Sequence, residues 1–253
     1  MKQLTAADYA DTGQWKLQIN LREEGLDAWL KNTIHTDLPP QQLFEKKRDK
    51  KEENYLKWLE ESVYSYPRLL DDFSTRIKIF DNKTIFLPSE FVTEDDLSEE
   101  EAYADLFDEE ISDVIADRDK DIVALFNPGK GVKSFLLRTF PGAKITSHLM
   151  DSYRLHKNKA SGPTLFLDRR DNDSDIILLD AEGLVSASTH VTKTGNDALY
   201  HALNKTDFYG YKPEEVKLIW EGKEAENDVK PLLKKFKEIK NENNTGKIRQ
   251  KEI

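Results

Sequence analysis

The stretch 164–220 constrains the fold most, because the spacing of its apolar residues changes twice. Apolar runs or strict alternation with polar residues mark four segments, and helical spacing marks one. A period of 2 is typical of strands and a period of 3.6 of a helix. The stretch therefore predicts three meandering strands, a helix and a further strand, with the respective ranges 164–168, 175–180, 184–191, 194–203 and 216–220.

Composition limits the class of protein. The chain has 253 residues, no cysteine and a formal net charge of -10. The length suffices for one large or two small domains, and the missing cysteines exclude disulfides and thiolate sites. An acidic chain repels nucleic-acid phosphates, so we expect no nucleic-acid partner. No apolar run approaches the roughly 18 residues of a membrane span, and residues 1–15 lack a signal-peptide core, so we expect a cytoplasmic protein.

The first part of the chain begins with a predicted hairpin. Residues 15–22 alternate apolar and polar side chains, and 26–30 continue as a partner strand after the turn Glu23-Glu24-Gly25. The charged run 45–53 indicates a solvated loop or helix start. A helix is expected over 55–66, where apolar residues recur at helical spacing.

A second hairpin is expected from 77 to 87, with Asp81-Asn82-Lys83 as its turn. The acid-rich segment 94–121 follows, with fourteen Asp or Glu and two basic residues. It is interpreted as a solubilising flank around a helix, with an acidic docking surface or a cation site as the alternative. Asp117 to Asp121 alternate like calcium ligands but lack the glycine that a calcium loop requires.

The middle of the chain predicts a strand at 122–126, a turn and a helix at 132–140. The sequence around Gly131 and Ser134 is superficially like a phosphate loop but lacks its full spacing, which favours an ordinary turn. The polar joint 157–163 is the expected linker.

We therefore expect an N-terminal lobe over 1–160 with an acidic helical insertion, and a C-terminal lobe over 161–240. The second lobe includes a helix near 229–236. A disordered tail is expected over 241–253, where no core pattern remains.

The two halves share an order of elements. Each begins with a hairpin, and 122–140 is matched with 216–239 as strand, turn and helix. The chain resembles a family of bacterial proteins, a domain of unknown function with an actin-like ATPase, ribonuclease-H-like fold. The resemblance rests on 15–19, 121–131 and 175–183 and covers most of 12–240. It implies an α/β fold of two duplicated ribonuclease-H-like lobes around a cleft.

The resemblance also suggests where a ligand would bind. Active actin-like ATPases hold phosphate in two hairpin turns that combine Asp with Gly, and they use a Gly-rich loop for adenosine. The first turn here, 20–25, has no Asp and carries two acids, while the second, 168–173, has no Gly. The expected cleft residues are Asn20, Arg22, Asp168, Arg169, Arg170, Gly195 and Asn196. The three arginines would there face an anion or a partner's acidic side chain; the favoured alternative is that they pair on the surface with Glu23, Glu24 and Asp171.

Other catalytic patterns are weak. Asp168 and Asp180 end neighbouring strands, as a ribonuclease-H-like nuclease would require, but strand ends commonly carry Asp. The five histidines show no metal-ligand spacing. Ser186, Ser188 and Thr189 beside His190 form no nucleophile elbow and are interpreted as an exposed strand face.

These observations favour a non-enzymatic binding or scaffold protein with an unidentified protein partner and no resident cofactor or metal. The alternative is a nucleotide-binding ATPase or kinase-like enzyme with diverged phosphate loops, which would use ATP and magnesium. The sequence leaves the oligomeric state open.

Overall fold

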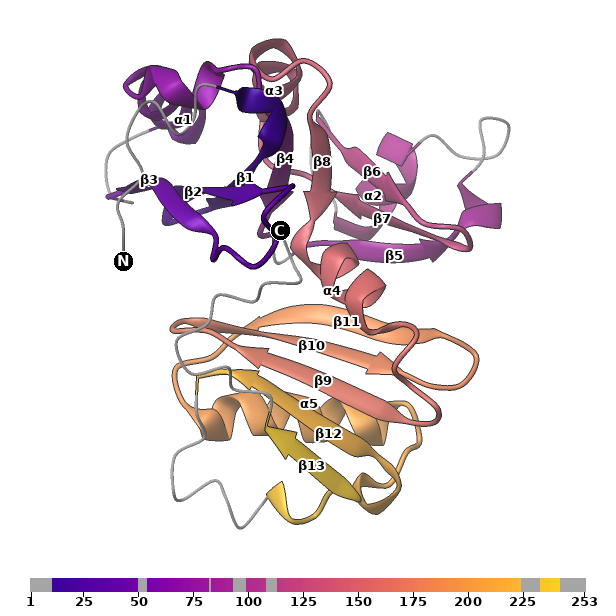
Figure 1. Ribbon diagram of the computed structural model, residues 1–253. Helices are drawn as coiled ribbons and strands as arrows, with labels where there is room; N and C mark the ends of the chain where they lie inside the picture. Colours follow the sequence, from indigo (N-terminus) through magenta and orange to yellow (C-terminus); the bar gives the residue numbers. More distant parts are fainter. Residues whose placement is uncertain are drawn as a thin grey trace. The chain divides into compact units, whose positions relative to one another are not determined.

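The computed structural model describes residues 11–49, 54–81, 83–92, 99–107, 113–223 and 233–241. Contacts divide these residues into two compact units. The first unit comprises 11–81 and 87–148, and the second comprises 83–86 and 149–241. Each unit is built around its own five-stranded sheet (Figure 1).

The sheet of the first unit has the order β3-β2-β1-β4-β8. Its strands are β1 (Trp15–Arg22), β2 (Gly25–Asn32), β3 (Gln41–Lys47), β4 (Ser74–Ile79) and β8 (Lys144–Ser147). The first three strands are antiparallel neighbours, whereas β4 runs parallel to both β1 and β8. The predicted hairpin of β1 and β2 is confirmed.

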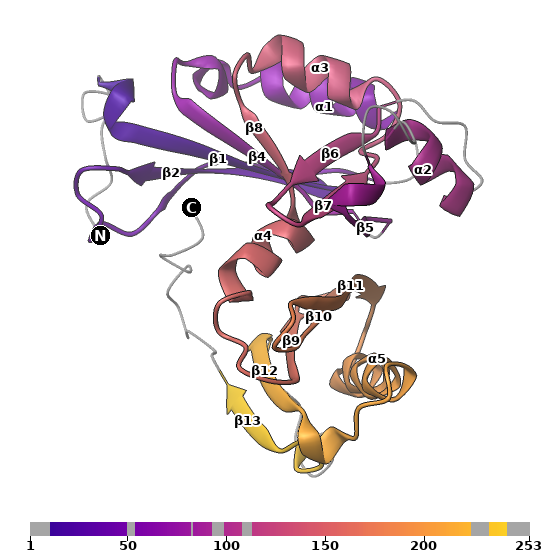
Figure 2. The same ribbon diagram turned by 90° about the vertical axis from the view of Figure 1, so that its right-hand side faces the viewer.

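Alternation along β1 decides which face of this sheet is buried. Leu17, Ile19 and Leu21 are buried in one core with side chains of the helices α1 (Tyr55–Tyr64) and α3 (Val132–Thr139). Figure 2 shows both helices on the same face of the sheet. The predicted helices over 55–66 and 132–140 are confirmed, and the intervening positions of β1 line the opposite, polar face.

A three-stranded sheet of order β5-β7-β6 is inserted between β4 and β8. It consists of β5 (Ile85–Pro88), β6 (Ile115–Arg118) and β7 (Ile122–Phe126), with α2 (Glu99–Phe107) between β5 and β6. The predicted hairpin over 77–87 is therefore wrong, because β4 and β5 lie in different sheets. Both edges of β4 already pair with β1 and β8, which leaves no edge for β5.

The sheet of the second unit has the order β11-β10-β9-β12-β13. Its strands are β9 (Thr164–Arg169), β10 (Asp173–Leu179), β11 (Leu184–Val191), β12 (Lys217–Gly222) and β13 (Glu238–Asn241). The helix α5 (Gly195–Phe208) packs against one face, where Ala198, Leu199 and Ala202 join a core with residues of β9, β10 and β12. These strands and this helix confirm the prediction for 164–220.

The other face of the second sheet contacts the end of α4 (His148–His156). The ring of His156 stacks on Phe166 with centroids 4.0 Å apart, and its Nε2 lies 3.8 Å from a carboxylate oxygen of Glu221.

Short 3-10 helices complete the described elements: η2 (Thr12–Gln14), η3 (Pro67–Leu70), η4 (Ser89–Phe91) and η5 (Pro213–Glu215).

The two five-stranded sheets have the same topology, which confirms the predicted duplication. In each, three antiparallel strands are followed by two parallel ones. The predicted match of 122–140 with 216–239 is wrong. The counterpart of β12 is β4, because β7 belongs to the inserted sheet.

Two strands lie where none was expected. The last three residues of β3 lie in the charged run that begins at residue 45, and β13 follows the expected helix near 229–236. Residues 224–232 and 242–253 lie outside the described part of the chain, and with them the first half of that helix and nearly all of the expected tail. Asn241 ends β13. Within the described ranges, no helix is both long and apolar enough to cross a membrane.

Candidate functional site

The first hairpin carries an ion pair on its polar face. Asp27 of β2 accepts hydrogen bonds from the Arg22 guanidinium, from Asn20 Nδ2 at 2.6 Å and from Trp29 Nε1 at 2.5 Å. Asn20 lies directly opposite Asp27 in the register of β1 and β2. The carboxylate therefore engages the two first-hairpin residues that the sequence proposed as ligand contacts.

Further contacts hold this pair in place. The Arg22 guanidinium lies over the Phe80 ring, 4.3 Å from its centroid, an arrangement that a cation–π interaction favours. Asn20 Oδ1 in turn accepts a hydrogen bond of 2.9 Å from Gln18 Nε2. The polar face of β1 is thus linked from Gln18 through Asn20 to Asp27.

The glycine of the first turn has a structural reason. A Cβ at Gly25 would lie 2.6 Å from the backbone oxygen of Lys46 in β3, closer than real Cβ contacts allow. Gly25 therefore permits the close approach of β3. Glu23 and Glu24 at this turn are exposed acids, which would repel a phosphate group.

The second hairpin has an arginine at the equivalent place. Arg170 donates to Asp175 through both terminal nitrogens, with Nη2 2.8 Å from Oδ1, and its Nε donates to Asp173. Its Nη1 also lies 4.0 Å from Asp168. Burial lowers the pKa of Arg170, but attraction by Asp175, Asp173 and Asp168 outweighs burial and raises that pKa above its ordinary value.

Asp175 is the buried partner of this pair. Its side chain is 4% exposed, against 21% for Arg170, and it also accepts a hydrogen bond of 2.7 Å from Thr189 Oγ1. Asp168 lies opposite Asp175 in the register of β9 and β10. A guanidinium held by three carboxylates has little capacity left for an external anion.

Arg169 lies on the other face of the second sheet. Alternation places it on the side of α5, and it is only 2% exposed. Gly222 of β12 lies against the end of β9: a Cβ added there would be 2.2 Å from the Arg169 backbone oxygen. Arg169 and Arg170 therefore point to opposite faces.

Gly195 and Asn196 form the first turn of α5, which is capped by the chain itself. Thr194 Oγ1 accepts a hydrogen bond from Asp197 N at 3.1 Å, and Asp197 Oδ2 accepts from Thr194 N at 2.9 Å. Hydrogen bonds from the Thr194 and Lys193 amides lower the pKa of the Asp197 carboxyl. This carboxylate bonds amides that precede the helix and adds a negative charge to the first turn, which disfavours an anion there.

The turn after β7 is also internally bonded. Gly131 N donates to the Asp113 carboxylate, and Lys133 Nζ donates to Val114 O at 2.6 Å. Gly131 has φ 80°, a conformation that favours glycine. These contacts favour the interpretation as an ordinary strand-to-helix turn.

Sequence reasoning missed both carboxylate partners of the arginine pairs. It considered Glu23, Glu24 and Asp171 as the surface partners, whereas Arg22 and Arg170 pair with Asp27 and Asp175. The signal was present as an acid five residues after each arginine, at the same place in both hairpins. The expectation that the two hairpins share a cleft stays a prediction.

A polar cluster between β11 and α5 was also missed. Lys205 Nζ donates to Ser186 Oγ at 2.8 Å and to Ser188 Oγ at 2.7 Å, and Ser188 Oγ lies 2.8 Å from His190 Nε2. The His190 ring stacks on His201 with centroids 4.2 Å apart. The face that the sequence suggested to be exposed is half-buried and turned toward α5.

Burial lowers two pKa values in this cluster. Burial lowers the pKa of the Lys205 ammonium to about 8. Burial, His201 and Lys205 together lower the pKa of His190 to about 4. At neutral pH, His190 is therefore a neutral imidazole beside a cationic lysine.

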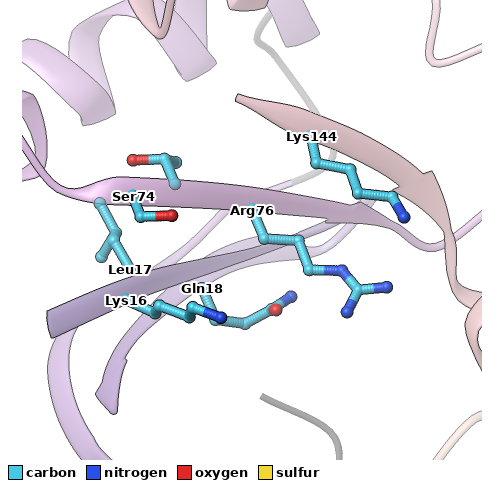
Figure 3. A pocket seen from close by; sticks show the side chains of 7 residues that line it. Lys16, Leu17, Gln18, Ser74, Arg76 and Lys144 are labelled. Atoms are coloured by element: carbon cyan, nitrogen blue, oxygen red, sulfur yellow. The ribbon is translucent and has the colours of Figure 1, made fainter. Parts of the chain in front are cut away.

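A basic pocket lies beside the first residues of β1, β4 and β8 (Figure 3). Its volume is about 260 Å³, and its lining residues are Lys16, Leu17, Gln18, Ser74, Thr75, Arg76 and Lys144. Sequence reasoning did not find it, because its cations come from β1, β4 and β8, which are distant in sequence.

Comparison with solved structures shows the fold. A protein with an actin-like ATPase fold and unknown function from Bacteroides thetaiotaomicron VPI-5482 superposes with a TM-score of 0.77 at 19% identity, over 92% of each chain. A PilM–PilN type IV pilus biogenesis complex matches with a TM-score of 0.45 at 12% identity, over 89% of this chain and 87% of that chain. The cytoplasmic domain of EpsL, from the type II secretion system of Vibrio cholerae, matches with a TM-score of 0.43 at 10% identity, over 81% and 80%.

The chain thus has the actin-like ATPase fold that its resemblance implied. No curated protein matches its sequence. A family model described as "Protein of unknown function (DUF3822)" matches residues 5–239, nearly the whole chain. The chain therefore belongs to the DUF3822 family of proteins of unknown function.

Proposed function

We propose that the protein is a non-enzymatic binding or scaffold protein on an actin-like fold. The observation that carries the proposal is the repeated arginine–aspartate pair. In the first hairpin of each five-stranded sheet, the arginine that could contact phosphate (Arg22 or Arg170) is held by a carboxylate of the next strand (Asp27 or Asp175). An ATPase needs these turns open to phosphate and magnesium, with backbone amides directed at the ligand.

The N-terminus of α5 supports the same conclusion. The Asp197 carboxylate accepts hydrogen bonds from the amides of Lys193 and Thr194, at 3.0 Å and 2.9 Å. An incoming nucleotide would have to displace this capping carboxylate or accept its repulsion. The second hairpin and the helix start of the same unit therefore both disfavour a polyphosphate.

Exposed apolar side chains support a protein partner. Phe208 is 81% exposed, Val191 70% and Tyr200 62%, and all three belong to the second unit. Large aromatic side chains are enriched in protein–protein interfaces. The partner that we propose is a protein, and the cell compartment that we propose is the cytoplasm.

Thermal unfolding with ATP and magnesium tests the proposal. A ligand bound only by the native state stabilises it by about 4 kcal/mol at a thousandfold excess over Kd. We expect millimolar ATP to give no magnesium-dependent rise in melting temperature. A clear magnesium-dependent rise, together with ATP hydrolysis above a buffer control, would instead favour the nucleotide-binding alternative.

A further inference from the structure

We propose that Lys205 is a modification site, at which a small acyl phosphate acylates the side-chain amine. The site is the polar cluster between β11 and α5, which consists of Ser186, Ser188, His190, His201 and Lys205. All five residues belong to the second unit, and none takes part in the arginine–aspartate pairs of the hairpins. The inference therefore goes beyond the proposed function and does not depend on it.

Two hydroxyl groups of one strand hold the amine of Lys205. Ser186 and Ser188 share a face of β11, because alternate residues of a strand point to the same side. Lys205 Nζ lies 2.8 Å from Ser186 Oγ and 2.7 Å from Ser188 Oγ. The amine is therefore fixed between a helix and a strand, unlike the amine of a lysine on an open surface.

The cluster gives this amine no negatively charged partner. Among the described residues, no carboxylate lies within ion-pair distance of Lys205. The nearby titratable groups are His190 on β11 and His201 on α5, and the charge of Asp175 on β10 acts on His190. An ammonium that is removed from water without a counter-charge is destabilised relative to the neutral amine. Burial accordingly lowers the pKa of Lys205 to about 8.

The number of hydrogen-bond acceptors also fits a neutral amine. An ammonium has three protons to donate, whereas a neutral amine has two protons and a lone pair. The described residues offer two acceptors, the hydroxyl oxygens of Ser186 and Ser188. With the imidazole proton on Nδ1, His190 Nε2 accepts the Ser188 proton at 2.8 Å, so this proton does not cover the amine. The lone pair of Lys205 is then available to an electrophile.

The cluster lies where a small reagent can reach it. β11 is the last strand in the order of its sheet, and the side chains of the cluster are neither buried nor fully exposed. Since no carboxylate adjoins the amine within the described residues, a negatively charged donor meets no repulsion at that distance. These features favour a small anionic acyl donor, which an acyl phosphate is.

The reaction is an acyl transfer without a change of oxidation state. The Lys205 nitrogen forms a bond to the acyl carbon, the bond between that carbon and the phosphate oxygen breaks, and the released phosphate takes the proton that nitrogen loses. With a pKa of about 8, about a tenth of the amine is neutral at pH 7, against about one part in 3,000 at the ordinary value of 10.5. The product is a neutral amide, which no longer has to be desolvated as an ion.

Labelling of the full chain with acetyl phosphate, followed by peptide mass spectrometry, tests the site. At pH 7 we expect acetylation of Lys205 to be about tenfold faster than that of the exposed lysines Lys193 and Lys212. The factor is smaller than the ratio of neutral fractions, because nucleophilicity falls with basicity, as it does in thiols. The rate at Lys205 should level off above about pH 8.

Two substitutions at one position test the role of the missing counter-charge. Ser188→Asp places a carboxylate beside the amine and should slow acetylation of Lys205 about tenfold or more, because an opposite charge favours the ammonium. Ser188→Ala is the matched control without a charge and should change the rate less than about threefold.

A third variant tests the position in the helix. Asn204→Lys adds an amine at the exposed position before Lys205. The added amine should be acetylated at the slow rate of Lys193, since it lies outside the cluster.

The proposal is overturned if Lys205 of the wild type is acetylated no faster than Lys193 and Lys212, a comparison that needs no variant. It is also overturned if the rate at Lys205 does not level off, or if Ser188→Asp and Ser188→Ala slow it equally. Equal acetylation of positions 204 and 205 in Asn204→Lys would assign the reactivity to this turn of α5 and overturn the role of the cluster. Melting temperatures in buffer alone identify any variant that fails to fold.

Discussion

Arg22 forms an ion pair with Asp27 in the first sheet, and Arg170 forms the equivalent pair with Asp175 in the second. In each pair the aspartate follows its arginine by five residues and accepts a hydrogen bond from a terminal guanidinium nitrogen. Each aspartate also lies opposite the residue two places before the arginine, which is Asn20 in one hairpin and Asp168 in the other. The duplication of the fold thus extends to one ion pair at equivalent places in the two sheets.

The second of these pairs should contribute substantially to stability. Asp175→Asn leaves Arg170 without its most buried partner, and breaking a buried ion pair costs about 3–5 kcal/mol. We expect the free energy of unfolding in urea to fall by about 3 kcal/mol. The control is Asp171→Asn, whose side chain is 88% exposed beside Lys223 and should change stability by less than about 0.5 kcal/mol. Equal effects of the two substitutions would contradict a structural role for the pair.

The first pair can be followed through a tryptophan. Asp27→Asn replaces a carboxylate that accepts from Asn20, Arg22 and Trp29, so one amide nitrogen must face a donor. We expect a loss of about 1–2 kcal/mol in unfolding free energy and a change in the fluorescence of Trp29. The same substitution in a Trp29→Phe background should leave fluorescence unchanged. If Asp27→Asn leaves the fluorescence spectrum of the otherwise wild-type chain unchanged, the Trp29 indole does not donate to Asp27.

His190 predicts a loss of stability in mild acid. Its pKa is about 4 in the folded chain against 6.5 for an ordinary histidine, because of burial, His201 and Lys205, with Asp175 acting in the opposite direction. Between these values the unfolded chain binds the proton that the folded chain does not, so stability is lost as the pH falls from about 6.5 to about 4. His190→Asn should lose less stability over this window than the wild type.

Urea unfolding at several pH values between neutrality and the lower end of that window measures the difference. The stability of the variant relative to the wild type should be constant above the upper limit and should rise as the pH falls. Parallel pH profiles of wild type and variant would show that His190 titrates normally in the folded chain.

Local periodicity predicted much of the fold. Apolar spacing predicted the strands β9, β10 and β11. Apolar spacing at the helical period, with Thr194 as the capping residue, predicted the helix α5. β3 escaped prediction because an edge strand tolerates the charges of Glu45, Lys46 and Lys47. The pairing of β4 escaped because parallel neighbours come from distant parts of the chain, which local turn signals cannot indicate.

The candidate site was predicted by position but not by partner. Asn20, Arg22, Asp168 and Arg170 were selected from the hairpin turns, and the structure gives each a contact in its own hairpin. Asp171 is the acid next to Arg170 in sequence, but Arg170 pairs with Asp173 and Asp175. These two aspartates share one face of β10, because alternate residues of a strand point to the same side. The residues of the basic pocket depend on register among three strands, which the sequence alone does not determine.

Calorimetric titration of ATP with magnesium tests the central claim most directly, namely that internal ion pairs have replaced the phosphate contacts of the hairpin turns. The measurement uses the wild type and Lys144→Gln, since ATP could also reach the basic pocket through its phosphates. We predict that any ATP binding is independent of magnesium, is equalled by pyrophosphate and is lost in Lys144→Gln. Magnesium-dependent ATP binding that persists in Lys144→Gln, and that Asp197→Ala strengthens by removing the cap of α5, would contradict the account.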